Sequence, residues 1–217
     1  MFTQSEENYL KAIFHLQQEV KKGVSTSSLS ELLVTKAASV TEMLKRLAEK
    51  NLVDYQKYYG VHLTAKGEKQ ALAIIRKHRL WESFLVERLN FNWDEVHEVA
   101  EQLEHIKSPK LVEELDKFLA RPDYDPHGDP IPDANGNMPK APKKRLSQIN
   151  EGEKAICKGF NDNSSSFLQF LAKHNIGLNT KLKVLQIESF DESMNVLVNQ
   201  KEILLSKTAT DNIYVED

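Results

Sequence analysis

The sequence predicts a mainly α-helical protein of three parts that ends in a small β-barrel. Apolar residues recur at helical spacing over most of residues 6–119, interrupted by one short alternating stretch at 52–63. Five prolines then gather within 123–144, and beyond them the pattern changes to short alternating strands. We therefore expect three domains, at residues 1–70, 71–140 and 146–217.

The composition is that of a globular protein. The chain has 217 residues, of which 40% are hydrophobic, enough to bury a full core. It contains no run of about 18 apolar residues, and its first residues lack the basic-then-apolar pattern of a signal peptide, so we expect a cytoplasmic protein without membrane contact. The single cysteine, Cys157, excludes an internal disulfide and argues against a zinc site built on thiolates.

Charge is distributed unevenly along the chain. The net charge is −3, but residues 1–80 hold 13 lysine and arginine residues against 8 acidic ones, whereas the rest holds 16 against 24. Phosphate contacts need local rather than total positive charge. The asymmetry therefore favours a polyanionic partner for the N-terminal part.

The predicted N-terminal domain begins with three helices. Apolar spacing predicts helices over 6–20 and 37–50, and Ser28 with Glu31 has the spacing of a capping box for a short helix between them. Two short helices joined by a tight turn are typical of a helix-turn-helix.

A two-stranded hairpin is predicted next, at 52–63, with its turn at Tyr59–Gly60. A helix-turn-helix followed by such a hairpin is a winged helix, whose second helix enters the DNA major groove while the hairpin contacts phosphates. A plain helical domain with one hairpin is the alternative. Glu42 would repel phosphate unless it accepts a hydrogen bond from a cytosine amino group. The candidate DNA-binding residues are Lys36, Ser39, Thr41, Glu42, Lys45, Arg46, Lys57, Tyr58 and Tyr59.

Two further apolar helices are predicted in the middle of the chain. One runs from Thr64 to Leu89, and another opens at Ser108–Pro109 and stops at Arg121–Pro122. Their apolar faces indicate a dimer interface, so we expect a homodimer.

Between them, residues 93–105 are predicted to form a helix that carries a metal site. Asn92 and Glu95 have the spacing of a helix cap. At about 100° per residue, four polar side chains fall within about one third of the helix circumference. These are His97, Glu101, Glu104 and His105, and the preceding helix adds His78 and Glu82 at the i, i+4 spacing. Imidazole and carboxylate ligands suit divalent first-row metals, although solvated helix faces are the alternative.

The C-terminal part is predicted to be a separate small domain. The proline-rich stretch at 123–144 has the composition of a linker. Beyond it, alternating residues predict a partly open β-barrel with one helix at 166–174. Its strands are expected at 155–157, 181–187, 194–198, 203–205 and 213–215.

Five motifs in this order resemble the diphtheria toxin repressor family of metal-activated transcriptional regulators. They are Glu7-Asn8-Tyr9-Leu10, Leu63-Thr64-Ala65-Lys66-Gly67, Arg76-Lys77-His78-Arg79-Leu80, Val96-His97-Glu98 with Leu103-Glu104-His105, and the phrase from Pro126 to Pro132. The resemblance implies a homodimer with an N-terminal DNA-binding domain, a helical metal-binding and dimerisation domain, and a barrel that resembles an SH3 fold. It also implies binding to palindromic operators when Mn(II) or Fe(II) is abundant, and repression of metal-uptake genes.

The family's metal ligands carry over onto two sets of residues. One set is His78, Glu82 and His97, and the other is Asn8, Glu101, Glu104 and His105. The iron-sensing branch has methionine and cysteine at positions 8 and 101, so Asn8 and Glu101 favour Mn(II) over Fe(II), with other divalent first-row metals as substitutes. Lys11 stands where some manganese sensors place a bridging carboxylate, which argues against their paired-metal arrangement. The barrel candidates for a further ligand are Asp162 and Asn163.

The remaining histidines, His15, His62, His127 and His174, are expected to be surface or structural residues, and Cys157 a buried inert thiol. A metal-dependent hydrolase and a metal-independent winged-helix regulator are the two rival functions. A metal-dependent hydrolase lacks support because no HExxH motif, phosphate loop or nucleophile elbow is present. A metal-independent winged-helix regulator would leave the histidines on solvated faces. We therefore expect a metal-dependent transcriptional repressor that is not an enzyme.

Overall fold

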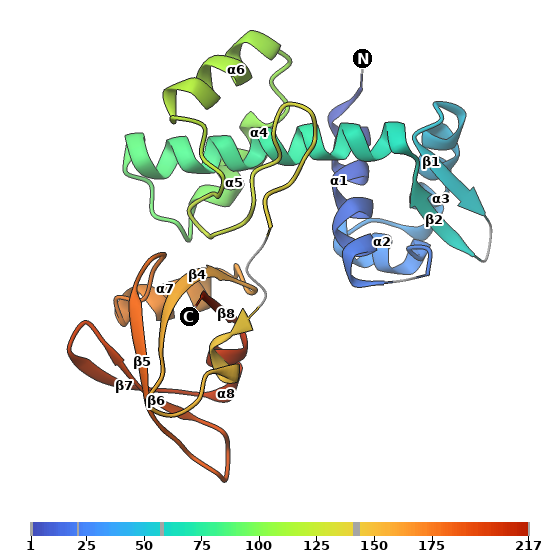
Figure 1. Cartoon of the computed structure of the whole chain (residues 1–217). Helices are drawn as coiled ribbons and strands as arrows, with labels where there is room; N and C mark the ends of the chain where they lie inside the picture. Colours follow the sequence, from blue (N-terminus) through green and yellow to red (C-terminus); the bar gives the residue numbers. More distant parts are fainter. Residues whose placement is uncertain (1, 21, 57–58, 141–143, 217) are drawn as a thin grey trace. The chain divides into compact units, whose positions relative to one another are not determined.

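The computed structural model describes residues 2–20, 22–56, 59–140 and 144–216 (Figure 1). The chain divides into two compact units. Unit one is Met1–His78 with Leu103–Ser108 and Pro132–Asn137, and unit two is Arg79–Gln102 with Pro109–Ile131 and Met138–Asp217. No helix within the described ranges is both long and apolar enough to cross a membrane.

Unit one begins with three helices, α1 (Gln4–Glu19), α2 (Thr26–Leu32) and α3 (Ala37–Glu49). The predicted helices are confirmed, but two of them start earlier than expected. Thr3 caps α1 through a complete capping box with Glu6. Ser25, rather than Ser28, caps α2, because its side chain accepts a hydrogen bond from the Ser28 backbone N–H.

The hairpin is also confirmed, as strands β1 (Val53–Gln56) and β2 (Gly60–Leu63) in antiparallel register. Gly60 has a φ of +94°, and a Cβ there would lie 2.7 Å from the backbone of Gly23 and Val24, so the turn requires glycine. The predicted DNA contacts Lys57 and Tyr58 lie outside the described residues. The three helices and the hairpin share one apolar core that includes Leu10, Leu29 and Leu44, which makes this part a winged helix.

The long helix α4 (Ala65–Leu89) contributes residues to both units. The Thr64 hydroxyl accepts a hydrogen bond from the Gly67 backbone N–H in its first turn. A Cβ at Gly67 would lie 1.9 Å from the carbonyl oxygen of Leu52, so α4 passes directly against the chain that leads into β1.

Unit two contains the short helices α5 (Val96–Leu103) and α6 (Pro109–Phe118). The predicted helix over 93–105 is therefore too long at both ends. Residues 93–95 form a turn, in which the Asn92 backbone N–H donates to the Glu95 carboxylate at 2.9 Å, as the cap spacing indicated. Glu104 and His105 lie in the turn after α5, so helical spacing does not determine where they point.

The proline-rich stretch is not a free linker over residues 125–131. Asp125, His127 and Ile131 are buried, and the Asp125 carboxylate accepts hydrogen bonds from the backbone N–H groups of His127 and Asp129. Gly128 has a φ of +87°, and a Cβ there would lie 2.3 Å from the carbonyl oxygen of Lys158. The content of proline and glycine predicts a linker, but it does not reveal the hydrogen bonds that order this segment.

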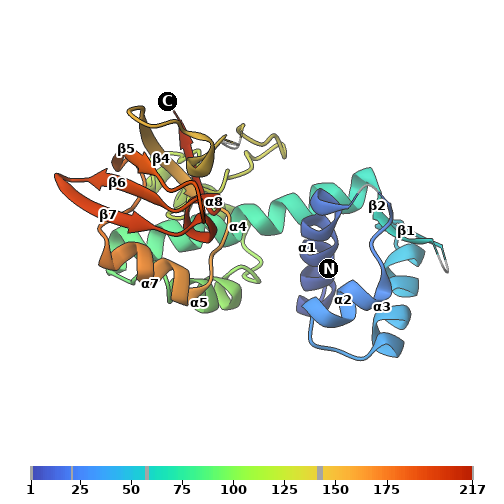
Figure 2. The same ribbon diagram turned by 90° about the horizontal axis from the view of Figure 1, so that it is seen from below.

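The C-terminal part is a six-stranded antiparallel sheet with strand order β3-β8-β4-β5-β6-β7. Its strands β5, β6 and β7 lie side by side in Figure 2. The strands are β3 (Lys144–Arg145), β4 (Lys154–Phe160), β5 (Lys181–Ile187), β6 (Met194–Val198), β7 (Lys201–Leu205) and β8 (Ile213–Glu216). The predicted helix is present as α7 (Ser165–Lys173), and a second short helix, α8 (Lys207–Asp211), was not predicted. The expected fold class, mainly α with a small C-terminal β-domain, is confirmed.

Candidate functional site

Helix α3 presents most of the predicted DNA-binding residues to solvent. Ser39, Lys45 and Arg46 are exposed, as is Lys36 at the helix N-cap. Thr41 is half-buried, and its hydroxyl donates to the carbonyl oxygen of Ala37 at 3.0 Å. Such an exposed, basic helix face is what a major groove accepts.

Glu42, the acidic residue on this face, is paired. Its carboxylate contacts the Arg46 guanidinium one turn later on α3. The pair reduces the repulsion that Glu42 alone would exert on phosphate. Tyr59, the described residue at the tip of the hairpin, is 78% exposed, so its ring is accessible.

A groove of about 500 Å³ lies between α1 and the helix-turn-helix, and Asn8 is one of its lining residues. Ser39, Glu42 and Arg46 line the same groove. Asn8 is exposed there, so this predicted ligand lies with the DNA-binding residues.

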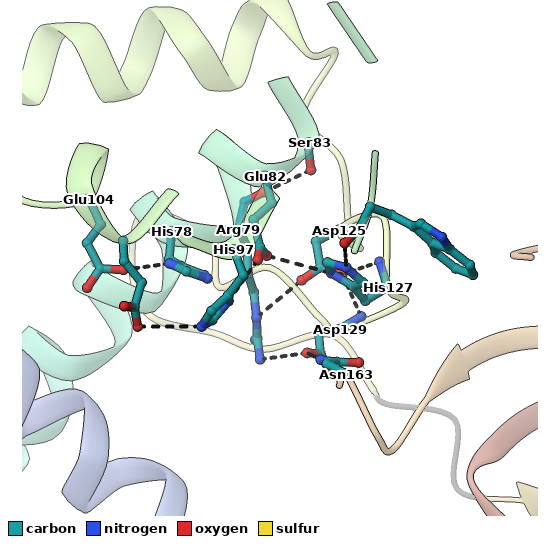
Figure 3. A network of polar contacts seen from close by, with 12 residues as sticks. His78, Arg79, Glu82, Ser83, His97, Glu104, Asp125, His127, Asp129 and Asn163 are labelled. Carbon is teal, nitrogen blue, oxygen red and sulfur yellow. Dashed lines mark hydrogen bonds and ion pairs between the residues drawn. The ribbon is translucent and has the colours of Figure 1, made fainter. Parts of the chain in front are cut away.

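A buried polar cluster in unit one is centred on Glu104, which is fully buried. Lys11 of α1 donates to both carboxylate oxygens at 2.8 Å. His78 Nδ1 lies 2.6 Å from Oε2, a contact that Figure 3 shows. Burial alone would raise the pKa of Glu104, but the hydrogen bond from His78 and the charge of Lys11 outweigh it and lower the pKa. Glu104 is therefore a carboxylate whose charge is already compensated.

Glu7 joins this cluster next to the predicted Asn8. His105 Nδ1 lies 2.6 Å from Glu7 Oε2, and His105 Nε2 lies 3.8 Å from Glu104 Oε1. Sequence reasoning did not single out Glu7. Its i, i+4 spacing from Lys11 on one helix was the available signal.

A second cluster lies in unit two around Glu82, which is also buried. Glu82 Oε1 lies 3.2 Å from His97 Nδ1, and His97 Nε2 lies 3.5 Å from Glu101 Oε1. The hydrogen bonds to Glu101 and Glu82 raise the pKa of His97 to about 9. The ligand atoms of His78, Glu82 and His97 lie within 4.8 Å of one another, as one predicted set requires. With Glu101 beside His97, four of the predicted ligands lie together.

Asp125 and His127 complete this second cluster, although the sequence did not predict them as ligands. The ligand atoms of Glu82, Asp125 and His127 lie within 4.8 Å of one another, and all three residues are buried. His127 Nε2 is 2.7 Å from the Trp93 carbonyl oxygen and so donates to it. The other ring nitrogen, Nδ1, carries the lone pair of the neutral imidazole, and it faces Glu82 Oε2 at 3.9 Å and Asp125 Oδ1 at 4.0 Å.

The charges in the second cluster are unbalanced. Arg79 is 3.6 Å from both Asp125 and Asp129, and His97, whose pKa is raised, pairs with Glu82 and Glu101. Four carboxylates therefore face two basic groups, Arg79 and His97. Burial, with the nearby charges of Asp129 and Glu82, raises the pKa of Asp125 well above its ordinary value. A histidine lone pair between buried carboxylates fits a divalent cation.

The barrel borders this cluster within unit two. The Trp93 ring stacks on His127 with 6.3 Å between centroids and meets Phe160 of β4 edge-on at 5.3 Å. Of the two predicted barrel ligands, Asn163 donates to Asp129 at 3.4 Å, whereas Asp162 accepts from the Ser164 backbone N–H.

Three sequence families match consecutive parts of the chain. Residues 1–61 match the N-terminal DNA binding domain of iron dependent repressors, residues 64–133 their metal binding and dimerisation domain, and residues 144–217 the FeoA domain.

Individual relatives match over different shares of their length. An uncharacterised helix-turn-helix regulator of Methanocaldococcus jannaschii is 36% identical over 55% of this chain and 95% of its own length. The iron-dependent repressor IdeR of Mycobacterium leprae is 34% identical over 58% of this chain and 54% of its own. A probable metal transport system membrane protein of Chlamydia trachomatis is 36% identical, but the match covers only 30% of it.

Solved structures match over almost the whole chain. A manganese-dependent transcriptional repressor in complex with manganese has a TM-score of 0.84 and 36% identity, covering 97% of this chain and 98% of its own. The manganese regulator SloR has a TM-score of 0.75 and 32% identity over 98% of both chains. ScaR with bound zinc has a TM-score of 0.77 and 31% identity, and the match covers 98% of this chain and 99% of the ScaR chain.

Proposed function

Because the chain belongs to the iron-dependent repressor family, which includes the diphtheria toxin repressor, we propose that it is a metal-activated transcriptional repressor. The winged helix of unit one would bind operator DNA when a divalent ion is bound, and release it when the ion is lost. The genes it controls would be those for metal uptake.

The observation that carries the proposal is the buried cluster around Glu82. Glu82, Asp125 and His127 place two carboxylates and a histidine lone pair within 4.8 Å, with a single arginine nearby. His97 and His78 are further candidate ligands, from α5 and α4. A bound divalent ion would supply positive charge that joins α4, α5 and the segment at 123–131.

The chemistry of these donors favours a hard ion. Carboxylate oxygens and imidazole nitrogens suit Mn(II), and the cysteine of the chain, Cys157, is buried in the barrel core rather than in this cluster. We therefore favour Mn(II) over Fe(II), with other divalent first-row ions as substitutes. SloR and ScaR, two matching structures, are described as manganese-activated or manganese regulators.

Operator recognition would rest on α3. Ser39, Thr41 and Glu42 would face base edges, and Lys36, Lys45 and Arg46 would contact phosphates. Lys57, Tyr58 and Tyr59 at the wing would add backbone contacts. A homodimer would read a palindromic operator, with half-sites spaced by whole turns of about 10.5 base pairs.

The test is operator binding, measured by fluorescence anisotropy with Mn(II), Fe(II), Zn(II) or a chelator. We expect Mn(II) to give the tightest binding and the chelator to abolish it. Glu82→Gln should lose the metal response, whereas Glu98→Gln, an exposed position on α5, should retain it. Operator affinity unaffected by the chelator would show a metal-independent regulator instead.

A further inference from the structure

We propose that Lys11 is a built-in cation that holds Glu104 as the orienting group for His78, so that Glu104 is not itself a metal ligand. This inference rests on the proposed metal dependence and assigns a role within it. It concerns residues of unit one that lie far apart in the sequence, in α1, in α4 and in the turn after α5.

The carboxylate of Glu104 is saturated by protein donors. Lys11 lies 2.8 Å from both of its oxygens, and His78 Nδ1 lies 2.6 Å from one of them. The Glu104 side chain is 0% exposed and that of Lys11 is 14% exposed, so the pair is shielded from water. The ammonium therefore takes the place beside the carboxylate that a metal ion would need.

The surrounding charges reinforce this assignment. Lys77 is half-buried and interacts with both carboxylates of the cluster, Glu7 and Glu104, and Lys107 is near enough to interact with Lys77. Two carboxylates thus face at least two ammonium groups. A divalent ion added here would meet no net attraction, because no negative charge is left uncompensated.

The cluster around Glu82 shows the opposite balance. There, four carboxylates, those of Glu82, Glu101, Asp125 and Asp129, outnumber their two basic partners, Arg79 and His97. The sequence predicts both Glu82 and Glu104 as metal ligands. In the structure, the negative charge around Glu104 is balanced by protein groups, whereas that around Glu82 is not.

Glu104 can instead act through His78. When Nδ1 of His78 donates its proton to Glu104, Nε2 is left with a lone pair. Metal-binding histidines commonly donate their second ring N–H to a carboxylate, which fixes the tautomer and the ring orientation. His78 precedes Glu82 by one helical turn, so Lys11 and Glu104 would hold it ready to ligate the ion bound by Glu82.

The first test counts the Mn(II) ions bound by the full chain, from the EPR signal of the free ion and from calorimetry. Glu104→Gln should bind as many ions as the parent, with an affinity about 10- to 100-fold weaker, the effect typical of groups that orient a ligand. Glu82→Gln should bind fewer ions. A Glu104→Gln chain that loses one ion, or that binds as tightly as the parent, would overturn the assignment.

The second test removes the ammonium. Lys11→Met should leave the buried Glu104 carboxylate without a cation and so gain one Mn(II) per chain, whereas Lys11→Arg should not. A folded Lys11→Met chain that gains no ion would contradict the role of Lys11. If Lys11→Met does not fold, as judged by circular dichroism, the number of Mn(II) ions bound by Glu104→Gln still tests whether Glu104 is a metal ligand. A parent chain that binds no Mn(II) would instead refute the proposed function.

Discussion

At the scale of a residue, one hydrogen bond of His127 determines which of its ring nitrogens faces the acidic cluster. Its Nε2–H donates to the Trp93 carbonyl oxygen, and this turns Nδ1, the nitrogen that would bind a metal ion, toward Glu82 and Asp125. The sequence suggested a surface or structural role because His127 has no ligand-like neighbour at helical spacing. In the structure it is 3% exposed and stands among acidic groups.

At the same scale, Gly128 and Gly152 form a matched pair for a stability test. Both have a positive φ, +87° and +83°, but a Cβ at Gly128 would lie 2.3 Å from the Lys158 carbonyl oxygen, whereas a Cβ at Gly152 meets no atom within 4 Å. Gly152→Ala should lower the free energy of unfolding by about 1–2 kcal/mol through backbone strain alone. Gly128→Ala should lower it by about 1–3 kcal/mol more. Urea unfolding in chelator would measure both, and equal losses would contradict the close approach.

Cys157 should be chemically inert in the folded chain. It is fully buried, and burial raises the pKa of its thiol to about 12. At pH 8 only about one thiol in 10⁴ would be a thiolate, the form that reacts. We expect a thiol-reactive dye to label the native chain very slowly and the urea-unfolded chain with one equivalent. Rapid labelling of the native chain would show that the barrel opens readily around β4.

At the scale of elements, periodicity and caps located the helices and strands. Most boundaries of α1, α3 and α4 agree to within two residues because their apolar stripes and caps are complete. The helix over 93–105 was overestimated because Glu104 and His105 continue the helical spacing although the chain has already turned. Composition predicts a linker at 125–131, but the segment is ordered by hydrogen bonds and packing that composition does not reveal.

Helix α3 is the element on which a DNA-binding prediction rests. Lys45 is exposed on α3, and we expect it to contact phosphate rather than bases. Lys45→Ala should weaken binding to all sequences alike and reduce the salt dependence by about one released counterion. Anisotropy titrations at several salt concentrations would measure this. Lys181→Ala, at an exposed position in the barrel, is the charge-matched control. Identical salt slopes for the parent, Lys45→Ala and Lys181→Ala would show that Lys45 does not contact DNA.

At the scale of the whole molecule, the two polar clusters depend on contacts between distant parts of the sequence. Lys11 and Glu104 are 93 residues apart in the sequence, and Glu82 and Asp125 are 43 residues apart. The sequence identified His78, Glu82, His97, Glu104 and His105 as polar candidates because they share helices or motifs. It could not show that Glu104 faces a lysine, since that pairing exists only once α1, α4 and the turn after α5 have packed together.

Metal binding should therefore be visible in the stability of the entire chain. An ion that binds only the folded form adds about 2.7 kcal/mol to the free energy of unfolding when its concentration is 100 times its Kd. In chelator, Glu82→Gln should be as stable as the parent or more stable, because it removes one of two adjacent buried carboxylates. In Mn(II), the parent should gain this stability while Glu82→Gln gains little, so that the order of the two chains reverses. Thermal and urea unfolding with and without Mn(II) would measure which chain is more stable in each condition. Glu98→Gln should gain as much stability from Mn(II) as the parent does. An equal gain in Glu82→Gln would place the stabilising ion elsewhere in the molecule.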